Sequence, residues 1–222
     1  FQSEKDFLKD FPYFHILSLG CGGCADLMGF EYFIHQNNIE APVFYCGIDI
    51  NYKWSDIHTA IKRYADVNNI GFNIPFYKDV FSVFKEKGIT DTNIIVISYL
   101  ISYLYNSGQI RRIDELIQLV VDKIVIKKGA GNKLLFVIND VNSNKRGRDY
   151  FKYFETAILR RRLKITGCNF RFFDPGTLNE WQEIGEPYDI KYSVFSIPPE
   201  IKTRYHARAG VQSTIQLLLE VE

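Results

Sequence analysis

Short apolar runs alternate with amphipathic segments along most of this chain, and this alternation constrains the fold more than any other feature. Apolar runs of strand length occupy residues 15–19, 43–50, 72–77, 93–100, 133–138, 192–197 and 215–221. Segments with apolar residues at helical spacing occupy residues 4–11, 26–36, 55–66, 109–125 and 149–163. Because parallel strands need crossover helices between them, the pattern predicts an α/β fold. We expect a mainly parallel, seven-stranded sheet with helices on both faces.

The end of the chain departs from this alternation. Residues 192–197 and 215–221 follow each other without a long helical segment between them, which predicts a C-terminal antiparallel hairpin at the sheet edge. The length of 222 residues suits a single domain. We expect an N-terminal helix in 1–14, a cofactor-binding part in 15–140, and a basic helix with the last strands in 141–222.

Composition narrows the class of protein. Hydrophobic residues make up 46% and charged residues 24% of the chain, which are ordinary values for a globular protein and exclude a disordered one. Apolar runs stay short of the roughly 20 residues that span a bilayer, and a secretory leader is not visible. Since four cysteines are too few for a disulfide scaffold of this size, we expect a cytoplasmic protein without a membrane partner.

A glycine-rich turn follows the first apolar run and precedes a helical segment. It reads Gly-Cys-Gly-Gly-Cys-Ala-Asp over residues 20–26. Glycines allow a tight turn and let the backbone approach a ligand closely. A dinucleotide fits the pattern Gly20-x-Gly22-x-x-Ala25 followed by Asp49, and S-adenosylmethionine (SAM) is the other candidate. Asp26 favours SAM, because a carboxylate opposes a pyrophosphate but attracts an ammonium and a sulfonium.

The run Ile-Leu-Ser-Leu-Gly-Cys-Gly-Gly-Cys at residues 16–24 resembles motif I of the class I SAM-dependent methyltransferases, which have a Rossmann-like fold. The resemblance continues over nearly the whole chain, with residues 46–50, 76–80 and 94–104 similar to the next three motifs. It implies transfer of a methyl group from SAM. It also implies a set of cofactor-binding residues, namely Gly20, Cys21, Gly22, Asp26, Asp49, Ile50, Asp79, Val80 and Ser98.

Two of these residues have defined roles in the family that the chain resembles. The resemblance implies that Asp49 binds both ribose hydroxyls, which suits a carboxylate because it accepts two hydrogen bonds at once. It implies that Asp79 accepts from the adenine amino group. The sequence departs from the family pattern at Cys24, which replaces the third glycine and is expected to narrow the methionine pocket. It also has Ser18 where an acid often stands.

The loop after the fourth strand should face the methyl acceptor. It lacks both the Asn/Asp-Pro-Pro-Tyr signature and the Pro-Cys nucleophile of enzymes that methylate DNA bases, so we do not expect a DNA base as acceptor. The candidate catalytic residues are Tyr99, Tyr103 and Asp140, with Asp140 as a base and Asn139 beside it. Helix packing for the tyrosines and a turn or cap role for Asp140 are the structural alternatives.

Two further features leave the choice of partner open. Cys21 and Cys24 spell C-x-x-C, but a second pair and a histidine at ligand spacing nearby are missing, so we predict no metal site. The net charge of +1 conceals an uneven distribution, since residues 145–171 hold nine basic and two acidic side chains. This basic segment is expected either to bind RNA or an acidic protein or to form a solvated face.

The sequence therefore supports three hypotheses. The first is a SAM-dependent methyltransferase with an unidentified acceptor, RNA or a small molecule being favoured. The second is a methyltransferase-like scaffold or partner subunit with weak or no catalysis, motivated by Cys24 and by the apolar pair Leu100 and Ile101. The third is an NAD-dependent Rossmann enzyme.

Overall fold

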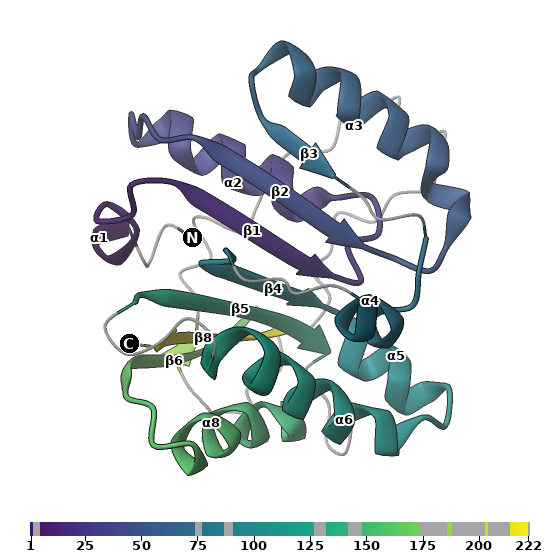
Figure 1. The fold of residues 1–222 in the computed structure, drawn as a ribbon, viewed down its shortest axis with the longest axis vertical. Helices are drawn as coiled ribbons and strands as arrows, with labels where there is room; N and C mark the ends of the chain where they lie inside the picture. Colours follow the sequence, from purple (N-terminus) through teal and green to yellow (C-terminus); the bar gives the residue numbers. More distant parts are fainter. Residues whose placement is uncertain are drawn as a thin grey trace.

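A sheet of eight strands forms the centre of the structure (Figure 1). The computed structural model describes residues 1, 5–73, 77–86, 91–126, 132–141, 148–173, 186–187, 203 and 214–221. The strand order across the sheet is β3-β2-β1-β4-β5-β8-β6-β7. The strands are β1 (Phe14–Leu19), β2 (Val43–Ile48), β3 (Gly71–Asn73), β4 (Ile94–Ser98), β5 (Leu134–Val141), β6 (Ile165–Phe173), β7 (Glu186–Pro187) and β8 (Thr214–Val221).

The first five strands are parallel to one another, which confirms the predicted α/β architecture. The chain builds the sheet outward from β1 through β2 to β3 and then returns to β4 on the other side of β1. This reversal places a topological switch point beside the carboxyl end of β1, where open α/β sheets bind ligands. Figure 1 shows these strands pointing the same way, so their carboxyl ends share one edge of the sheet.

Helices cover both faces of the sheet, as predicted. They are α1 (Lys5–Leu8), α2 (Ala25–Gln36), the 3-10 turn Tyr52–Trp54, α3 (Ser55–Val67), α4 (Val80–Glu86), α5 (Leu100–Asn106), α6 (Ile110–Val120) continued by the π-turn Val121–Val125, the 3-10 turn Arg148–Tyr150, and α8 (Phe151–Arg160). One core cluster joins α1, α2 and α3 to the sheet, and a second joins α4, α5, α6 and α8 to its opposite face. In Figure 1, α2 lies behind the sheet, whereas α4, α5, α6 and α8 lie in front.

The strongest elements follow directly from their residues. Strand β4 reads Ile-Ile-Val-Ile-Ser, and its four apolar residues are fully buried because helices cover both faces. Helix α6 buries Ile113, Leu116, Ile117 and Val120, whose spacing of three and four residues forms one apolar stripe. Among the described residues, no helix is both long enough and apolar enough to cross a membrane.

The C-terminal part of the sheet differs from the prediction. The described sheet has eight strands, and two of them, β6 at Ile165–Phe173 and the two-residue β7 at Glu186–Pro187, were not expected. Strand β8 is antiparallel to both β5 and β6 and is inserted between them, so it does not lie at the sheet edge. The expected strand at 192–197 lies outside the described residues. Apolar and polar residues alternate over 168–172 in β6, which is the period-two pattern of a strand, but the sequence has no continuous apolar run there.

Strand ends and short helices were also placed imprecisely by the sequence. Strand β4 ends at Ser98, two residues before the predicted end, since Tyr99 adopts the left-handed conformation with φ 57° and Leu100 begins α5. Strand β2 ends at Ile48 rather than at Ile50. Helix α5 itself was expected as a loop.

Candidate functional site

The glycine loop leaves the carboxyl end of β1 in a conformation that requires small residues. Gly20 and Gly22 have φ values of 72° and 49°, in the left-handed region where a Cβ is unfavourable. The amides of Gly20 and Cys21 both donate to the carbonyl oxygen of Ile48, at 2.8 and 3.1 Å. The loop is thereby fixed to the end of β2, with backbone exposed at the switch point.

Asp49 connects this loop to the next one. Its Oδ2 accepts a hydrogen bond from the amide of Gly22 at 2.8 Å, and its Oδ1 accepts from the amide of Asn51 at 2.7 Å. Each carboxylate oxygen has two lone pairs, so each retains acceptor capacity for a ligand. Asp49 is half-buried, and the neighbouring Ile50 is 61% exposed. The predicted pair Asp49 and Gly22 is thus brought together by direct contact.

The two cysteines of the loop point into the protein. Cys21 is 7% exposed and Cys24 is fully buried, and both belong to the core cluster beneath α2. A hydrogen bond with Cys24, reinforced by burial, raises the pKa of the Cys21 thiol far above its usual range. Cys24 is the N-cap of α2 with φ 56°, so it adopts the conformation that the third glycine of the motif would favour. Its side chain is buried in the core cluster, and the expected narrowing of the methionine pocket stays a prediction.

Asp26 lies in the first turn of α2 and faces β1 and β2 rather than the loop glycines. The hydroxyl of Tyr45 donates to its Oδ1 at 3.0 Å, and Ser18 also hydrogen-bonds to it. Burial raises the pKa of the Asp26 carboxyl, and both of these hydrogen bonds oppose that shift. Ser18, the residue in place of the expected acid, therefore supports an acid that stands further along the chain.

His58, on α3, and Trp54, at the end of the preceding 3-10 turn, both lie against the loop, and sequence reasoning found neither. His58 Nε2 lies 2.6 Å from the carbonyl oxygen of Gly22, and its Nδ1 lies 3.3 Å from the hydroxyl of Tyr77. The Trp54 ring lies 3.6–3.9 Å from the Cβ positions that Gly22 and Gly23 would have. His58 is buried with Ile61 and Ala65 at helical spacing on α3, a periodicity that could have placed it facing inward.

Asp79 and Val80 stand at the start of α4. Asp79 Oδ1 accepts from the amide of Phe81 at 3.3 Å, and its Oδ2 accepts from the guanidinium of Arg112 at 2.7 Å. Arg112, on α6, also stacks 3.8 Å above the Phe81 ring. Val80 is 7% exposed and packs into the core. Asp79 thus caps a helix and forms an ion pair, and it shares no described hydrogen bond with the glycine loop.

Ser98 and Tyr99 lie at the carboxyl end of β4. The Ser98 carbonyl oxygen lies 3.8 Å from the Cβ position that Gly20 would have, so Ser98 adjoins the glycine loop. The amide of Tyr99 donates to the carbonyl of Asn139 at 2.8 Å. Burial, and next the charge of Asp140, raise the pKa of the Tyr99 hydroxyl. Tyr99 is 46% exposed, and Tyr103, one helical turn further on, is 56% exposed.

Asp140 is fully buried at the end of β5. Its Oδ2 accepts from the amide of Ser102 at 3.1 Å, and its Oδ1 accepts from the amide of Val141 at 2.7 Å. Burial raises the pKa of its carboxyl, although these hydrogen bonds oppose the shift. In this geometry Asp140 caps α5 from a neighbouring strand and faces away from solvent.

Comparison with solved structures identifies the architecture. A SAM-dependent methyltransferase from Archaeoglobus fulgidus matches with a TM-score of 0.52 at 12% identity, over 100% of this chain and 92% of that one. The chain has the fold of the class I SAM-dependent methyltransferases. A structure described as an antibiotic-related methyltransferase also matches, with 16% identity and a TM-score of 0.49. The match covers 100% of this chain and 94% of that chain. No family model and no curated protein matches the sequence.

The methyltransferase fold agrees with the Rossmann-like architecture predicted from the sequence. Of the predicted cofactor residues, the structure joins Gly20, Cys21, Gly22, Asp49 and Ser98 at one edge of the sheet. Asp26 and Asp79 have their described partners elsewhere. The role of each residue in this methyltransferase fold stays a prediction.

Proposed function

We propose that the protein binds SAM over the glycine loop and Asp49 and transfers its methyl group to an acceptor at the edge of the sheet. The observation that carries this proposal is the contact between Asp49 and Gly22. An acid from the end of β2 holds the backbone of the loop after β1, at the switch point of a class I methyltransferase fold. This arrangement supports a site for a ligand that carries both hydroxyl groups and positive charge.

The residues of the loop fit such a ligand. Gly20 and Gly22 present backbone without a Cβ, and Cys24 is buried. Leu100 lies next to Gly20, and the Trp54 ring lies next to Gly22. Both oxygens of Asp49 keep a free lone pair beside the amides that they bind. The Trp54 ring adds an aromatic surface next to Gly23. We propose that Asp49 binds the ribose hydroxyls, as the family resemblance implies.

When bound, the cofactor supplies an electrophilic methyl group on a sulfonium. The residues of this chain have to orient the acceptor and, where the acceptor atom carries a proton, remove that proton. The Tyr99 hydroxyl carries a proton near neutral pH, as tyrosine ordinarily does, and is suited to donate a hydrogen bond to the acceptor. The buried Asp140 binds amides at the start of α5, and we propose that it positions Tyr99 rather than acting as a base.

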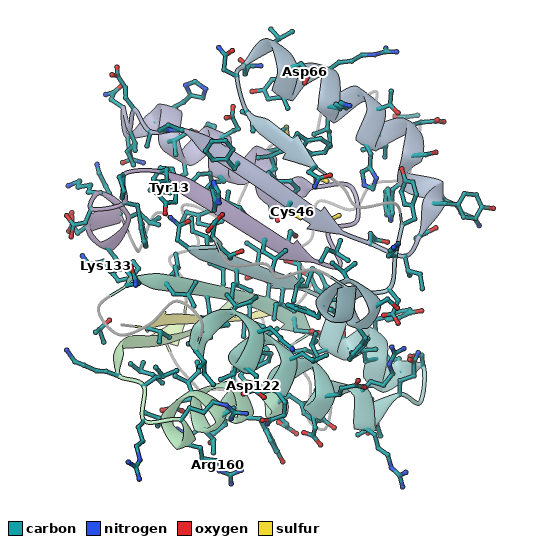
Figure 2. The ribbon with its side chains drawn as sticks, viewed as in Figure 1. Tyr13, Cys46, Asp66, Asp122, Lys133 and Arg160 are labelled. Carbon is teal, nitrogen blue, oxygen red and sulfur yellow. The ribbon has the colours of Figure 1, made fainter. Side chains whose placement is uncertain are left out.

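The acceptor class is proposed as RNA or a small molecule. The basic segment 145–171 would contact RNA or an acidic partner, but part of its charge is already neutralised. Arg161 pairs with Asp122 at 2.6 Å, and Lys152 pairs with Glu155 at 2.5 Å. Arg160 is exposed on α8 (Figure 2). If RNA binds here, R160E weakens RNA binding, whereas R111E, on the exposed side of α6, leaves it unchanged.

Titration calorimetry with SAM and with its demethylated product tests cofactor binding. We expect binding by the wild type and a loss of at least about tenfold, or 1.4 kcal/mol, in D49A. The matched control is D66A, since Asp66 lies at the far end of α3 from the carboxyl ends of the strands (Figure 2). Absence of SAM binding by the wild type, or equal affinity for wild type and D49A, would refute the proposal. Binding of NAD in place of SAM would favour the dinucleotide hypothesis.

A non-catalytic scaffold is the second candidate function. It is favoured by the complete burial of Asp140 and by the pairing of Asp79 with Arg112, which leave few free acids at the site. Incubation with methyl-labelled SAM and separate RNA, protein and small-molecule fractions of a cell extract distinguishes the two. Transfer of label that Y99F reduces supports the enzyme, whereas SAM binding without transfer to any fraction supports the scaffold.

A further inference from the structure

Three side chains of the types that bind metal ions lie close together beneath the glycine loop. The ligand atoms of Cys21, Cys24 and His58 all lie within 4.8 Å of one another. The side chains come from two elements, because the cysteines flank the start of α2 and His58 lies on α3. All three residues are buried, with exposed fractions of 7%, 0% and 5%. Close approach of two thiols and an imidazole in the interior is an arrangement that metal sites use.

The ligand types and spacing select zinc. Cysteine thiolates and histidine imidazole are the usual zinc ligands, and two cysteines two residues apart form the common half of such sites. Tetrahedral zinc has bonds of about 2.3 Å to sulfur and about 2.0 Å to nitrogen, which places ligand atoms about 3.5–3.8 Å apart. The present cluster therefore needs a contraction of at most about 1.3 Å between any two ligand atoms to reach this geometry.

The surroundings of His58 also suit a ligand. Its Nε2 lies 2.6 Å from the carbonyl oxygen of Gly22, which can only accept, so Nε2 carries the proton here and gives up this hydrogen bond when it binds a metal. Its Nδ1 faces the Tyr77 hydroxyl, and the two rings are stacked with centroids 5.6 Å apart. If Nε2 binds a metal, the proton moves to Nδ1 and the Tyr77 oxygen accepts it. A hydrogen bond of this kind fixes the tautomer and orientation of metal-bound histidines.

We propose that Cys21, Cys24 and His58 form a zinc(II) site that binds the glycine loop to α3, with water in the fourth coordination position. Binding converts the two thiols to thiolates and releases their protons to solvent. The site lies on the inner side of the loop, since both cysteines belong to the core cluster beneath α2. The inference does not rest on SAM binding and can be tested without it.

Metal content and cobalt spectroscopy of the full chain test this site. After purification under reducing conditions, removal of metal and reloading with zinc, we expect one zinc per chain that survives gel filtration. Cobalt(II) in place of zinc should give the intense visible bands of a tetrahedral site and a near-ultraviolet thiolate band. The cobalt spectrum of the wild type decides the ligand type even where a variant fails to fold.

Variants assign the ligands. C21S, C24S and H58N should each weaken zinc binding by more than the tenfold to hundredfold that is typical of losing an outer partner, and Y77F by about tenfold. The matched controls are C46S, on β2 outside the cluster, and H35N, on the exposed side of α2. Both should bind zinc like the wild type.

Several results would overturn the proposal. They are failure of the wild type to retain zinc, a cobalt spectrum without a thiolate band, or unchanged affinity in C24S. A mass two hydrogens lower after reducing purification would instead show a disulfide between Cys21 and Cys24. If the wild type binds zinc but does not bind SAM, the proposed function is rejected and the proposed zinc site is still supported.

Discussion

The carboxylate of Asp49 and the amide of Gly22 are joined by a hydrogen bond of 2.8 Å, which ties the end of β2 to the loop after β1. The other carboxylate oxygen binds the amide of Asn51 at 2.7 Å. A single side chain therefore fixes the relative position of two loops at the edge of the sheet. Hydrogen bonds to a charged group contribute more than neutral ones, because the charge strengthens the attraction.

This relationship predicts a loss of stability in Asp49 variants. Removal of both hydrogen bonds in D49A should lower the free energy of unfolding by about 2 kcal/mol, and hence Tm by about 4–8 °C at this chain length. D49N retains one oxygen acceptor and should lose about half as much. Thermal unfolding followed by circular dichroism measures both. Equal Tm values for wild type and D49A would show that the two bonds contribute nothing to stability.

Cys24 predicts a difference between two small substitutions. It adopts φ 56° at the N-cap of α2, where a residue with a Cβ is strained by roughly 1 kcal/mol and glycine is not. C24A and C24G both remove the buried sulfur, but C24G also relieves the strain. We expect C24G to be more stable than C24A by about 1 kcal/mol in urea unfolding.

Cys21 provides the control for this comparison, because its φ is not positive. There the order should reverse, with C21A more stable than C21G by up to about 1 kcal/mol, since glycine has the more flexible unfolded chain. If C24G and C24A were equally stable, the left-handed conformation at Cys24 would carry no strain.

Much of the fold could be predicted from the sequence, because the parallel strands are buried on both faces and therefore read as apolar runs. Strands β1, β2, β4 and β5 and helices α2, α3 and α6 lie within a few residues of their predicted positions. Strand β6, beside the antiparallel β8, was missed because it has the alternating pattern of an antiparallel strand rather than the continuous apolar run of the parallel strands. Tyr99 ended β4 early through a left-handed backbone conformation that side-chain patterns do not encode.

The site was predictable only where residues close in sequence make it. The glycine loop and Asp49 follow from motifs at strand ends. His58 and Arg112 join the site through tertiary contacts, to Gly22 and to Asp79, that span many residues. From the sequence alone we predict no metal site, because no histidine lies at ligand spacing near the C-x-x-C pair. In the proposed zinc site, His58 comes from α3, further along the chain than the C-x-x-C pair.

Asp26 and Asp140 predict a pH dependence of stability. Burial raises the pKa of both carboxyls in the native state. The native protein therefore binds more protons than the unfolded chain, so the contribution of these groups to the free energy of unfolding falls as pH rises. This contribution to the free energy of unfolding is fully present below the unfolded pKa of about 3.9. It is lost as pH rises through the raised native pKa values.

Urea unfolding of the wild type and of D26N/D140N, at a series of pH values from about 4 to about 8, measures this effect. The difference in unfolding free energy, wild type minus variant, should decrease as pH rises, because groups common to both proteins cancel. D66N, at an exposed position on α3, should parallel the wild type. A difference that increases with pH would mean that hydrogen bonds outweigh burial at these two acids.

Gly47 and Gly29 form a pair of glycines with opposite surroundings. A Cβ at Gly47, within β2, would lie 2.8 Å from the Cys21 sulfur and 3.0 Å from Cε1 of Tyr45, both of which are buried. A Cβ at Gly29, on the exposed side of α2, would meet nothing within 4 Å. G47A should therefore overpack the space beneath the glycine loop and lower the free energy of unfolding by about 1–3 kcal/mol. G29A should raise it by up to about 1 kcal/mol, because alanine is the better helix former. Urea unfolding of both variants measures the two effects.

Since G47A acts by displacing Cys21, it should also weaken zinc binding, while G29A leaves zinc binding unchanged. A stable G47A with unaltered zinc affinity would mean that the Cys21 side chain moves aside freely and is not held where the cluster requires it.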